Sequence, residues 1–331
     1  MLAWGSGSLS LRDKNRQNKA SPTTSKSQFL ATRPKHMSTI LPRIPEIDWS
    51  RDFEPYWCNG NRTITHWFNA VSFMLPAGEQ YFHETAREVA KDLDLSNNPR
   101  LAQEVRDFTV QESLHAAQHR HYNEGLAKQG FDNIVEPSIL WMIKLGRRFL
   151  SPLTNLAAVC AYEHYTAILA EHMLKSESKW MKTAPDMALF WGWHAAEETE
   201  HKAVCFDLYV AAGGGWLRRA SMFVAVSFTF YFLFFMPAYL YLLRKDRQLR
   251  PQTRPQTRPQ KRGSTVSLKN VAFALRGPVG FAFGAVMDYL RPGFHPWQRD
   301  NRARMEEWLR DNEVRLRLIC SSVRKPGSNA A

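Results

Sequence analysis

Two short stretches of this sequence repeat one pattern of metal-binding side chains. Glu112 is followed three residues later by His115, and Glu198 is followed at the same spacing by His201. Residues three apart lie on one face of an α-helix, so each pair presents a carboxylate beside an imidazole. Carboxylate oxygens and imidazole nitrogens are common ligands of divalent metal ions. Each stretch therefore predicts half of a metal centre.

Each stretch also carries a second imidazole on the same helix face. His119 follows His115 by four residues, and His194 precedes Glu198 by four. We expect these two histidines to act either as extra ligands or as partners that orient a ligating imidazole. The candidate catalytic residues are Glu112, Glu198, His119 and His194.

Two single glutamates complete the pattern. Glu79 precedes the first pair, with Glu84 as a competitor for its position, and Glu163 lies between the two pairs. A helix bundle that holds two metal ions takes one carboxylate from each of two helices and a Glu-x-x-His from each of the other two. The predicted ligands of two metal ions are therefore Glu79, Glu112, His115, Glu163, Glu198 and His201.

Surface charge pairs offer a simpler account of such spacings, because Glu and His three or four residues apart often pair on exposed helix faces. This account suits Glu197 and Glu200, which point away from the stripe that carries Glu198. We therefore expect both to be surface charges. It does not explain the ordered repetition of the four glutamates and two histidines.

Four helices must position these ligands, and the fold class is predicted to be all-α. The expected helices cover residues 63–93, residues 100–129, a segment that begins near Pro152 and a segment that begins at about Asp186. Pro76 is expected to interrupt the first helix, and the last is expected to run unbroken through His201 to Asp207. The long gap at residues 131–151 fits two hairpins joined by a crossover.

Charge divides the chain into an acidic centre and basic flanks. Residues 1–45 carry a net charge of +7, residues 46–212 of −8 and residues 213–331 of +14. An acidic centre suits a site built from carboxylates, and basic flanks suit an anionic surface. We expect a disordered N-terminal extension at 1–45, with the late onset of organised sequence favouring Met37 over Met1 as the start, and a helix bundle at 46–212.

An apolar segment follows the acidic centre. Residues 220–243 contain no charged side chain and are long enough to span a bilayer. The expected regions are a membrane segment with a basic flank at 213–250, a Pro/Gln/Arg repeat linker at 251–270 and a helical, membrane-associated C-terminal region at 271–331. No secretory signal pattern precedes the metal residues, so we expect the metal domain to be cytoplasmic.

Four blocks of this sequence resemble the bacterial "predicted metal-dependent hydrolase" family. They are SFMLPAGEQYF at 72–82, the Glu112 block at 112–123, EHYTA at 163–167 and WHAAEETEHKAV at 193–204. The resemblance covers roughly residues 41–243. It implies a ferritin-like four-helix bundle that binds metal, and the name of the family implies hydrolysis.

The ligand set is compatible with three kinds of function. Our leading expectation is a di-iron centre that activates O2 to oxidise an apolar small molecule, with a membrane lipid surface and an electron donor protein as partners. The alternative is a two-metal hydrolase, with zinc or manganese, that acts on an ester or phosphate. The third is a metal-binding protein without turnover. No aromatic and basic recognition motif is present, so no nucleic acid is expected.

Overall fold

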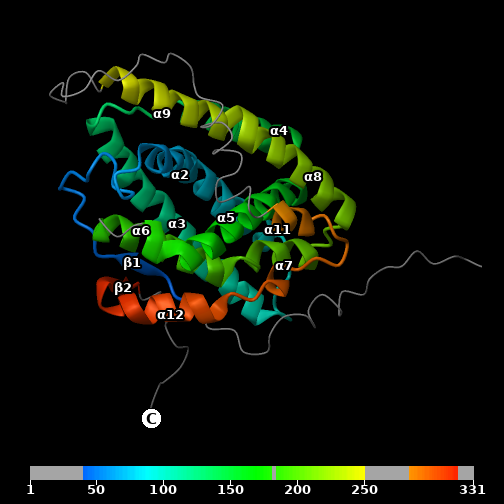
Figure 1. Cartoon of the computed structure of the whole chain (residues 1–331). Helices are drawn as coiled ribbons and strands as arrows, with labels where there is room; N and C mark the ends of the chain where they lie inside the picture. Colours follow the sequence, from blue (N-terminus) through cyan, green and yellow to red (C-terminus); the bar gives the residue numbers. More distant parts are fainter. Residues whose placement is uncertain (1–39, 181–183, 250–282, 320–331) are drawn as a thin grey trace, which may run out of the picture.

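The computed structural model describes residues 40–180, 184–249 and 283–319. This part of the chain is mainly helical, with two short strands (Figure 1), which confirms the predicted helical class. The N-terminal extension up to residue 39, including Met1 and Met37, lies outside the described residues. So do the repeat linker at 251–270 and residues 271–282 and 320–331 of the predicted C-terminal region.

Four long helices carry the predicted metal ligands. They are α2 (Arg62–Lys91), α3 (Pro99–Lys128), α5 (Pro152–Trp180) and α6 (Pro185–His201). Helix α2 packs along α3 and α5, and α5 packs along α6. Asn61 and Asn98 begin α2 and α3, each accepting a hydrogen bond from a backbone N–H of the first turn. The elements that position the site are therefore close to those expected.

Two local expectations about these helices are wrong. Helix α2 continues through Pro76. Helix α6 ends at His201, and α7 (Val204–Ala211) begins after a turn. At that turn the Lys202 ammonium is buried and donates hydrogen bonds of 2.6 Å to the Arg299 carbonyl and to Asn301 Oδ1. A buried ammonium needs such acceptors, and here they come from a distant segment that local helix propensity does not reflect.

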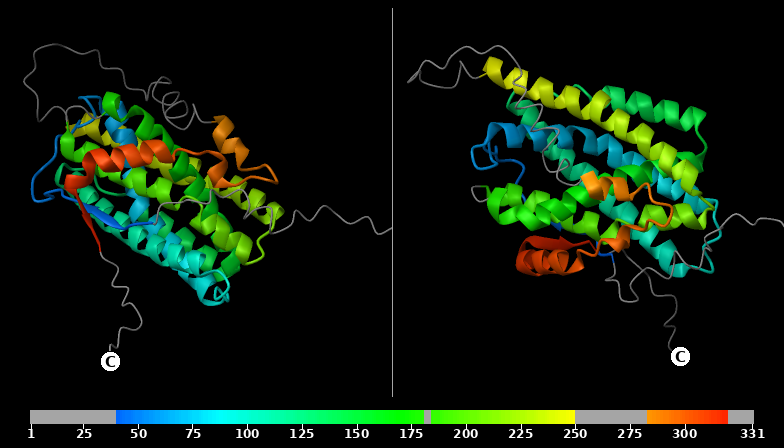
Figure 2. Two further views of the ribbon diagram at one scale, coloured as in Figure 1. Left: turned by 90° about the horizontal axis from the view of Figure 1, so that it is seen from below. Right: turned by 45° about the vertical axis from the view of Figure 1, so that its right-hand side comes forward.

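The predicted crossover contains a further helix, α4 (Glu136–Phe149), which lies beside a long apolar segment (Figure 2). That segment consists of α8 (Trp216–Phe228), a π-helical stretch η1 (Thr229–Phe235) and α9 (Met236–Leu249). It is the one described helix long and apolar enough to cross a membrane. It also packs on α2 and α5, and 33% of its most apolar window is buried.

The two ends of the described chain meet on the opposite side of the molecule (Figure 1). Strand β1 (Arg43–Pro45) pairs antiparallel with β2 (Leu316–Leu318), and α12 (Arg302–Asn312) packs on α6. Helix α12 approaches at Gly192, where a Cβ atom would lie 2.5 Å from the Trp308 ring. The remaining elements are α11 (Phe283–Asp288) and the short 3-10 turns η4 (Pro296–Gln298) and η5 (Glu313–Arg315).

Candidate metal centre

The structure brings all six predicted ligands together between four helices. Helix α2 supplies Glu79, α3 supplies Glu112 and His115, α5 supplies Glu163, and α6 supplies Glu198 and His201. None of the six is more than 2% exposed. Glu84, the competitor of Glu79, lies at the surface and pairs with Arg147 at 2.6 Å.

The ligand atoms fall into two groups that share one residue. Glu79, His115, His194 and Glu198 offer atoms that all lie within 4.8 Å of one another, and Glu112, Glu198 and His201 do the same. Glu198 is therefore common to both groups, whereas Glu163 belongs to neither.

The two pairs with the repeated spacing face each other across the gap between α3 and α6. His201 Nε2 lies 3.2 Å from Glu112 Oε1, 3.3 Å from Glu198 Oε2 and 3.6 Å from Glu163 Oε2. His115 Nδ1 lies 3.4 Å from Glu112 Oε1 and 3.7 Å from Glu198 Oε1. Both pairs thus contribute to one buried cluster of possible metal ligands.

Nine buried atoms of the six ligands have no hydrogen-bond partner among the described residues. They are both carboxylate oxygens of Glu79, Glu112 and Glu163, and also Glu198 Oε2, His115 Nδ1 and His201 Nε2. Buried polar atoms without partners are costly and rare in native proteins. Divalent cations bind carboxylate oxygens and imidazole nitrogens of this kind, so this donor set fits a metal site.

In each ligand histidine, the hydrogen bond of the outer ring nitrogen, the one that points away from the carboxylate cluster, determines the tautomer. His115 Nε2 lies 3.1 Å from Glu197 Oε2, and His201 Nδ1 lies 3.0 Å from Gln111 Oε1. Both acceptors require a protonated outer nitrogen, so the lone pairs of His115 Nδ1 and His201 Nε2 face the carboxylates. Outer hydrogen bonds of this kind orient metal-ligating imidazoles.

Glu197 and Glu200 are buried, at 0% and 3% exposure, so the prediction that they are surface charges is wrong. Arg43 of β1 joins them to each other. Its guanidinium donates to both oxygens of Glu200, at 2.9 and 3.0 Å, and its backbone N–H donates to Glu197 Oε1 at 2.8 Å. Gln111 Nε2 also donates to Glu200, at 2.9 Å.

Sequence reasoning missed Arg43 and Gln111 as parts of the site. Gln111 directly precedes Glu112, so its place on a ligand helix offered a weak signal. Arg43 is 154 residues away from Glu197, and no spacing rule connects them.

A second hydrogen-bond chain runs through the two additional histidines. Asn123 Nδ2 donates to the Ser72 carbonyl, so its Oδ1 accepts the Ser72 hydroxyl proton at 2.8 Å. Ser72 Oγ must then accept from His119 Nδ1 at 2.9 Å, and His119 Nε2 accepts from His194 Nδ1 at 3.2 Å. In a neutral His194 this order leaves the Nε2 lone pair facing Glu198 Oε1, 3.3 Å away. His194 can thus bind metal, whereas His119 orients it.

Burial controls the ionisation of the ligands. It raises the pKa of Glu79, Glu112 and Glu163 well above the ordinary value, and their mutual repulsion adds to this effect. Burial opposes ionisation of Glu198 too, but His201 and His194, when protonated, outweigh it and hold its pKa well below the ordinary value. Burial also lowers the pKa of His115, which keeps the imidazole in its neutral, ligating form.

These shifts predict a pH dependence that metal should abolish. Carboxyl groups with raised pKa values stabilise the metal-free fold below about pH 4.5, the ordinary value, and this contribution is lost as pH rises through the folded-state pKa. Each carboxyl that keeps its proton only in the folded state should lower the free energy of unfolding by about 1.4 kcal/mol per pH unit. Urea unfolding at a series of pH values above about 4.5 should show this decline with a chelator but not with bound metal.

Comparison with known proteins adds one finding to this geometry. A family model described as "predicted metal-dependent hydrolase" matches residues 41–300, which extends beyond the roughly 41–243 that the resemblance covers. No curated protein and no solved structure matches the chain.

Proposed function

Since the chain belongs to the predicted metal-dependent hydrolase family, we propose that it hydrolyses an ester or phosphate at a centre of two divalent metal ions. The observation that carries this proposal is the set of nine buried ligand atoms without hydrogen-bond partners. The residues proposed to hold the metal ions are Glu79, Glu112, His115, Glu163, Glu198 and His201, with His194 as an additional ligand.

We also propose that α2, α3, α5 and α6 form a ferritin-like bundle. The support is the origin of the ligands: one glutamate from each of α2 and α5, and a Glu-x-x-His pair from each of α3 and α6. This distribution is the one found in two-metal carboxylate bundles.

The protein residues would have three tasks in such a reaction. Bound divalent ions would lower the pKa of a water molecule and polarise the oxygen of the group under attack. Glu112 and Glu198 would be metal ligands, and their negative charges would balance the charge of the ions. The chain from Asn123 through Ser72 and His119 would hold the His194 ring in place, with its Nε2 lone pair facing Glu198. Arg43 keeps Glu197 and Glu200 in position.

The leading expectation from the sequence, O2 activation by two irons with an electron donor protein, gains no support from the family match, which favours the hydrolase alternative. Four carboxylates and two imidazoles are nevertheless compatible with iron as well as with zinc or manganese. The identity of the metal therefore distinguishes the two chemistries.

The proposal is tested by metal analysis together with two activity assays on the same purified protein. We expect close to two zinc or manganese ions per chain and metal-dependent hydrolysis of p-nitrophenyl acyl or phosphate esters that a chelator abolishes. The result would favour an oxidase over a hydrolase if the protein held two irons, developed a new absorption band when its reduced form was exposed to air, and did not hydrolyse esters. Metal without either activity would indicate a binding protein.

We further propose that the protein lies on a membrane, with its metal domain on the cytoplasmic side. The support is one face on which α4 and the α8–η1 segment expose large apolar side chains, together with the exposed bases Lys144, Arg148 and Arg218. We call it the apolar face; its large exposed side chains are Leu140, Trp141, Phe149, Leu150, Leu217, Val224, Phe228, Phe232 and Leu233. Such a surface suits anionic lipid headgroups above an apolar layer.

Replacing Phe232 on the apolar face by Asp should weaken binding to anionic lipid vesicles roughly tenfold or more. The phenylalanine is 60% exposed, and transfer of such a side chain from water to lipid contributes about 1.5–3 kcal/mol. The control is Val314→Asp, because Val314 is 94% exposed in η5 on the opposite side of the molecule. Vesicle co-sedimentation measures both, and equal loss in the two variants would exclude the apolar face as the membrane-binding surface.

A further inference from the structure

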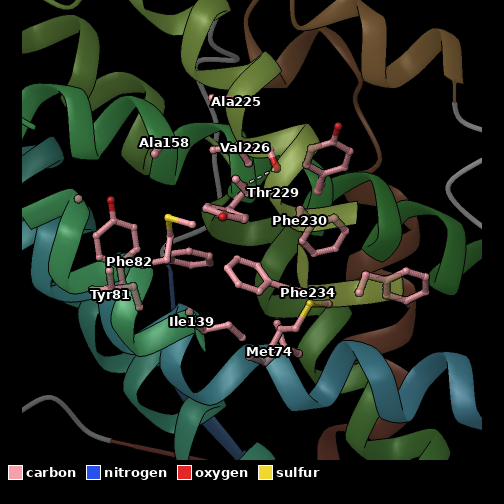
Figure 3. Close-up of a pocket in the computed structure, with 18 of the residues that line it drawn as sticks. Met74, Tyr81, Phe82, Ile139, Ala158, Ala225, Val226, Thr229, Phe230 and Phe234 are labelled. Carbon is pink, nitrogen blue, oxygen red and sulfur yellow. Dashed lines mark hydrogen bonds between the residues drawn. The ribbon is translucent and has the colours of Figure 1, made fainter. Parts of the chain in front are cut away.

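An apolar cavity of about 410 Å³ lies between α2, α4, α5 and the α8–η1 segment (Figure 3). Met74, Phe82, Ile139, Val226 and Phe234 are among its lining residues, and none of the described residues that line it is charged. Its size is within the range of ligand-binding pockets. The mechanism proposed above does not use it.

Several polar groups at the cavity wall already have partners, whereas Nε1 of the lining residue Trp67 is buried without one among the described residues. The Tyr81 hydroxyl donates to Asn155 Oδ1 at 2.9 Å, and the Thr229 hydroxyl donates to the Val226 carbonyl at 3.1 Å. The Thr166 hydroxyl likewise donates to the Glu163 carbonyl at 3.1 Å. A ligand with polar groups along its length would leave them unpaired in the cavity, so the cavity selects an apolar chain.

The cavity opens on the apolar face. Phe149, Leu150 and Ala225 line the cavity and are exposed, with Phe149 at 72%. They belong to the end of α4 and to α8, between which the mouth lies. An apolar molecule can thus pass from a lipid layer into the cavity without crossing water.

Two of the helices that carry metal ligands also line the cavity. Gly78 and Phe82 line it on either side of Glu79 in α2, and Tyr162 and Thr166 line it on either side of Glu163 in α5. The Phe82 and Tyr162 rings are stacked with their centroids 5.5 Å apart. The cavity therefore follows the two helices that contribute the single glutamates.

We propose that this cavity binds one long acyl chain of a lipid, which enters between α4 and α8. The identification of that lipid as the substrate, an acyl ester, rests on the proposed hydrolase function, whereas the binding of the chain does not. A metal-free protein should therefore still bind acyl chains.

Titration of the full-length protein with cis-parinaric acid, a fluorescent fatty acid, tests the binding. We expect saturable binding, unchanged by a chelator and weakened about tenfold or more by Ala225→Trp, because an indole at the mouth blocks entry. Val224→Trp is the matched control, since Val224 is 60% exposed on the same turn of α8 but does not line the cavity. Equal affinities of the two variants, or an absence of saturable binding, would overturn the proposal.

Two further measurements make the result independent of a folding defect. A fatty acid with a terminal photoreactive diazirine should label wild-type α2 and η1 at the cavity wall, and labelling confined to the exposed residues of the apolar face would contradict the proposal. Palmitate and lysophosphatidylcholine should both displace the probe, whereas displacement by palmitate alone would rule out a lipid with a headgroup. If the protein binds the probe but does not hydrolyse esters, the result would contradict the proposed hydrolase function and still support the acyl-chain site.

Discussion

Replacement of Glu198 by Gln is expected to remove most of the bound metal and to lower kcat/KM for ester hydrolysis by at least about 100-fold. Glu198 is the one residue in both groups of ligand atoms, so its loss affects both proposed metal positions. An amide provides one neutral oxygen where the carboxylate provides two charged ones, and cations in a buried site depend on that charge. Inductively coupled plasma mass spectrometry and steady-state kinetics measure the two effects.

The matched control is Glu84→Gln, which makes the same chemical change at an exposed residue on α2. It should leave both metal content and rate unchanged. The metal-free Glu198→Gln protein should remain folded by circular dichroism, and added metal should raise its Tm less than that of the wild type. A Glu198→Gln variant that keeps two metal ions and full activity would exclude the proposed centre.

Replacement of Arg43 by Met is expected to lower the free energy of unfolding by about 3–5 kcal/mol, because it leaves Glu197 and Glu200 buried without their counter-charge. Metal affinity should fall as well, by about 10–100-fold, since Glu197 orients His115 and Glu200 holds Gln111 against His201. Urea unfolding of the metal-free protein and competitive titration with a chelator separate the two effects.

Two variants test whether Arg43 acts through its charge or through its shape. Arg43→Lys keeps the charge but cannot bond to both oxygens of Glu200, so it should recover stability more than metal affinity. The double variant Arg43→Met with Glu200→Gln should be less destabilised than Arg43→Met alone, because one of the two buried charges is removed. If Arg43→Met matched the wild type in both measurements, a positioning role for Arg43 would be ruled out.

The sequence by itself was sufficient to predict the helical class, the family and the residues that the structure places together. Glu112 with His115 and Glu198 with His201 repeat a three-residue spacing, and helix geometry alone puts each pair on one face. Glu79 and Glu163 were predicted as ligands from their order in the chain, one before the first pair and one between the two pairs. Local periodicity could specify this much because each ligand pair is local to a single helix.

The tertiary structure decided the surroundings of those ligands. Glu197 and Glu200 are charged residues of a kind that usually lies at the surface, yet they are buried here, where Arg43 of β1 pairs with both. The end of α6 at His201 likewise coincides with the contact of Lys202 with Arg299 and Asn301. These contacts join segments about a hundred residues or more apart, so neither helix propensity nor hydrophobic period contains them.

The apolar segment formed by α8, η1 and α9 also has some properties that its sequence predicts and others that only the packing of the helices decides. Composition predicted a helix able to cross a membrane, and the described helix has that length. Its burial against α2 and α5 and the cavity it shares with α4 depend on how separate helices pack. Length and hydropathy are properties of one segment, whereas a cavity is the space that several segments leave between them, so only the folded chain defines it.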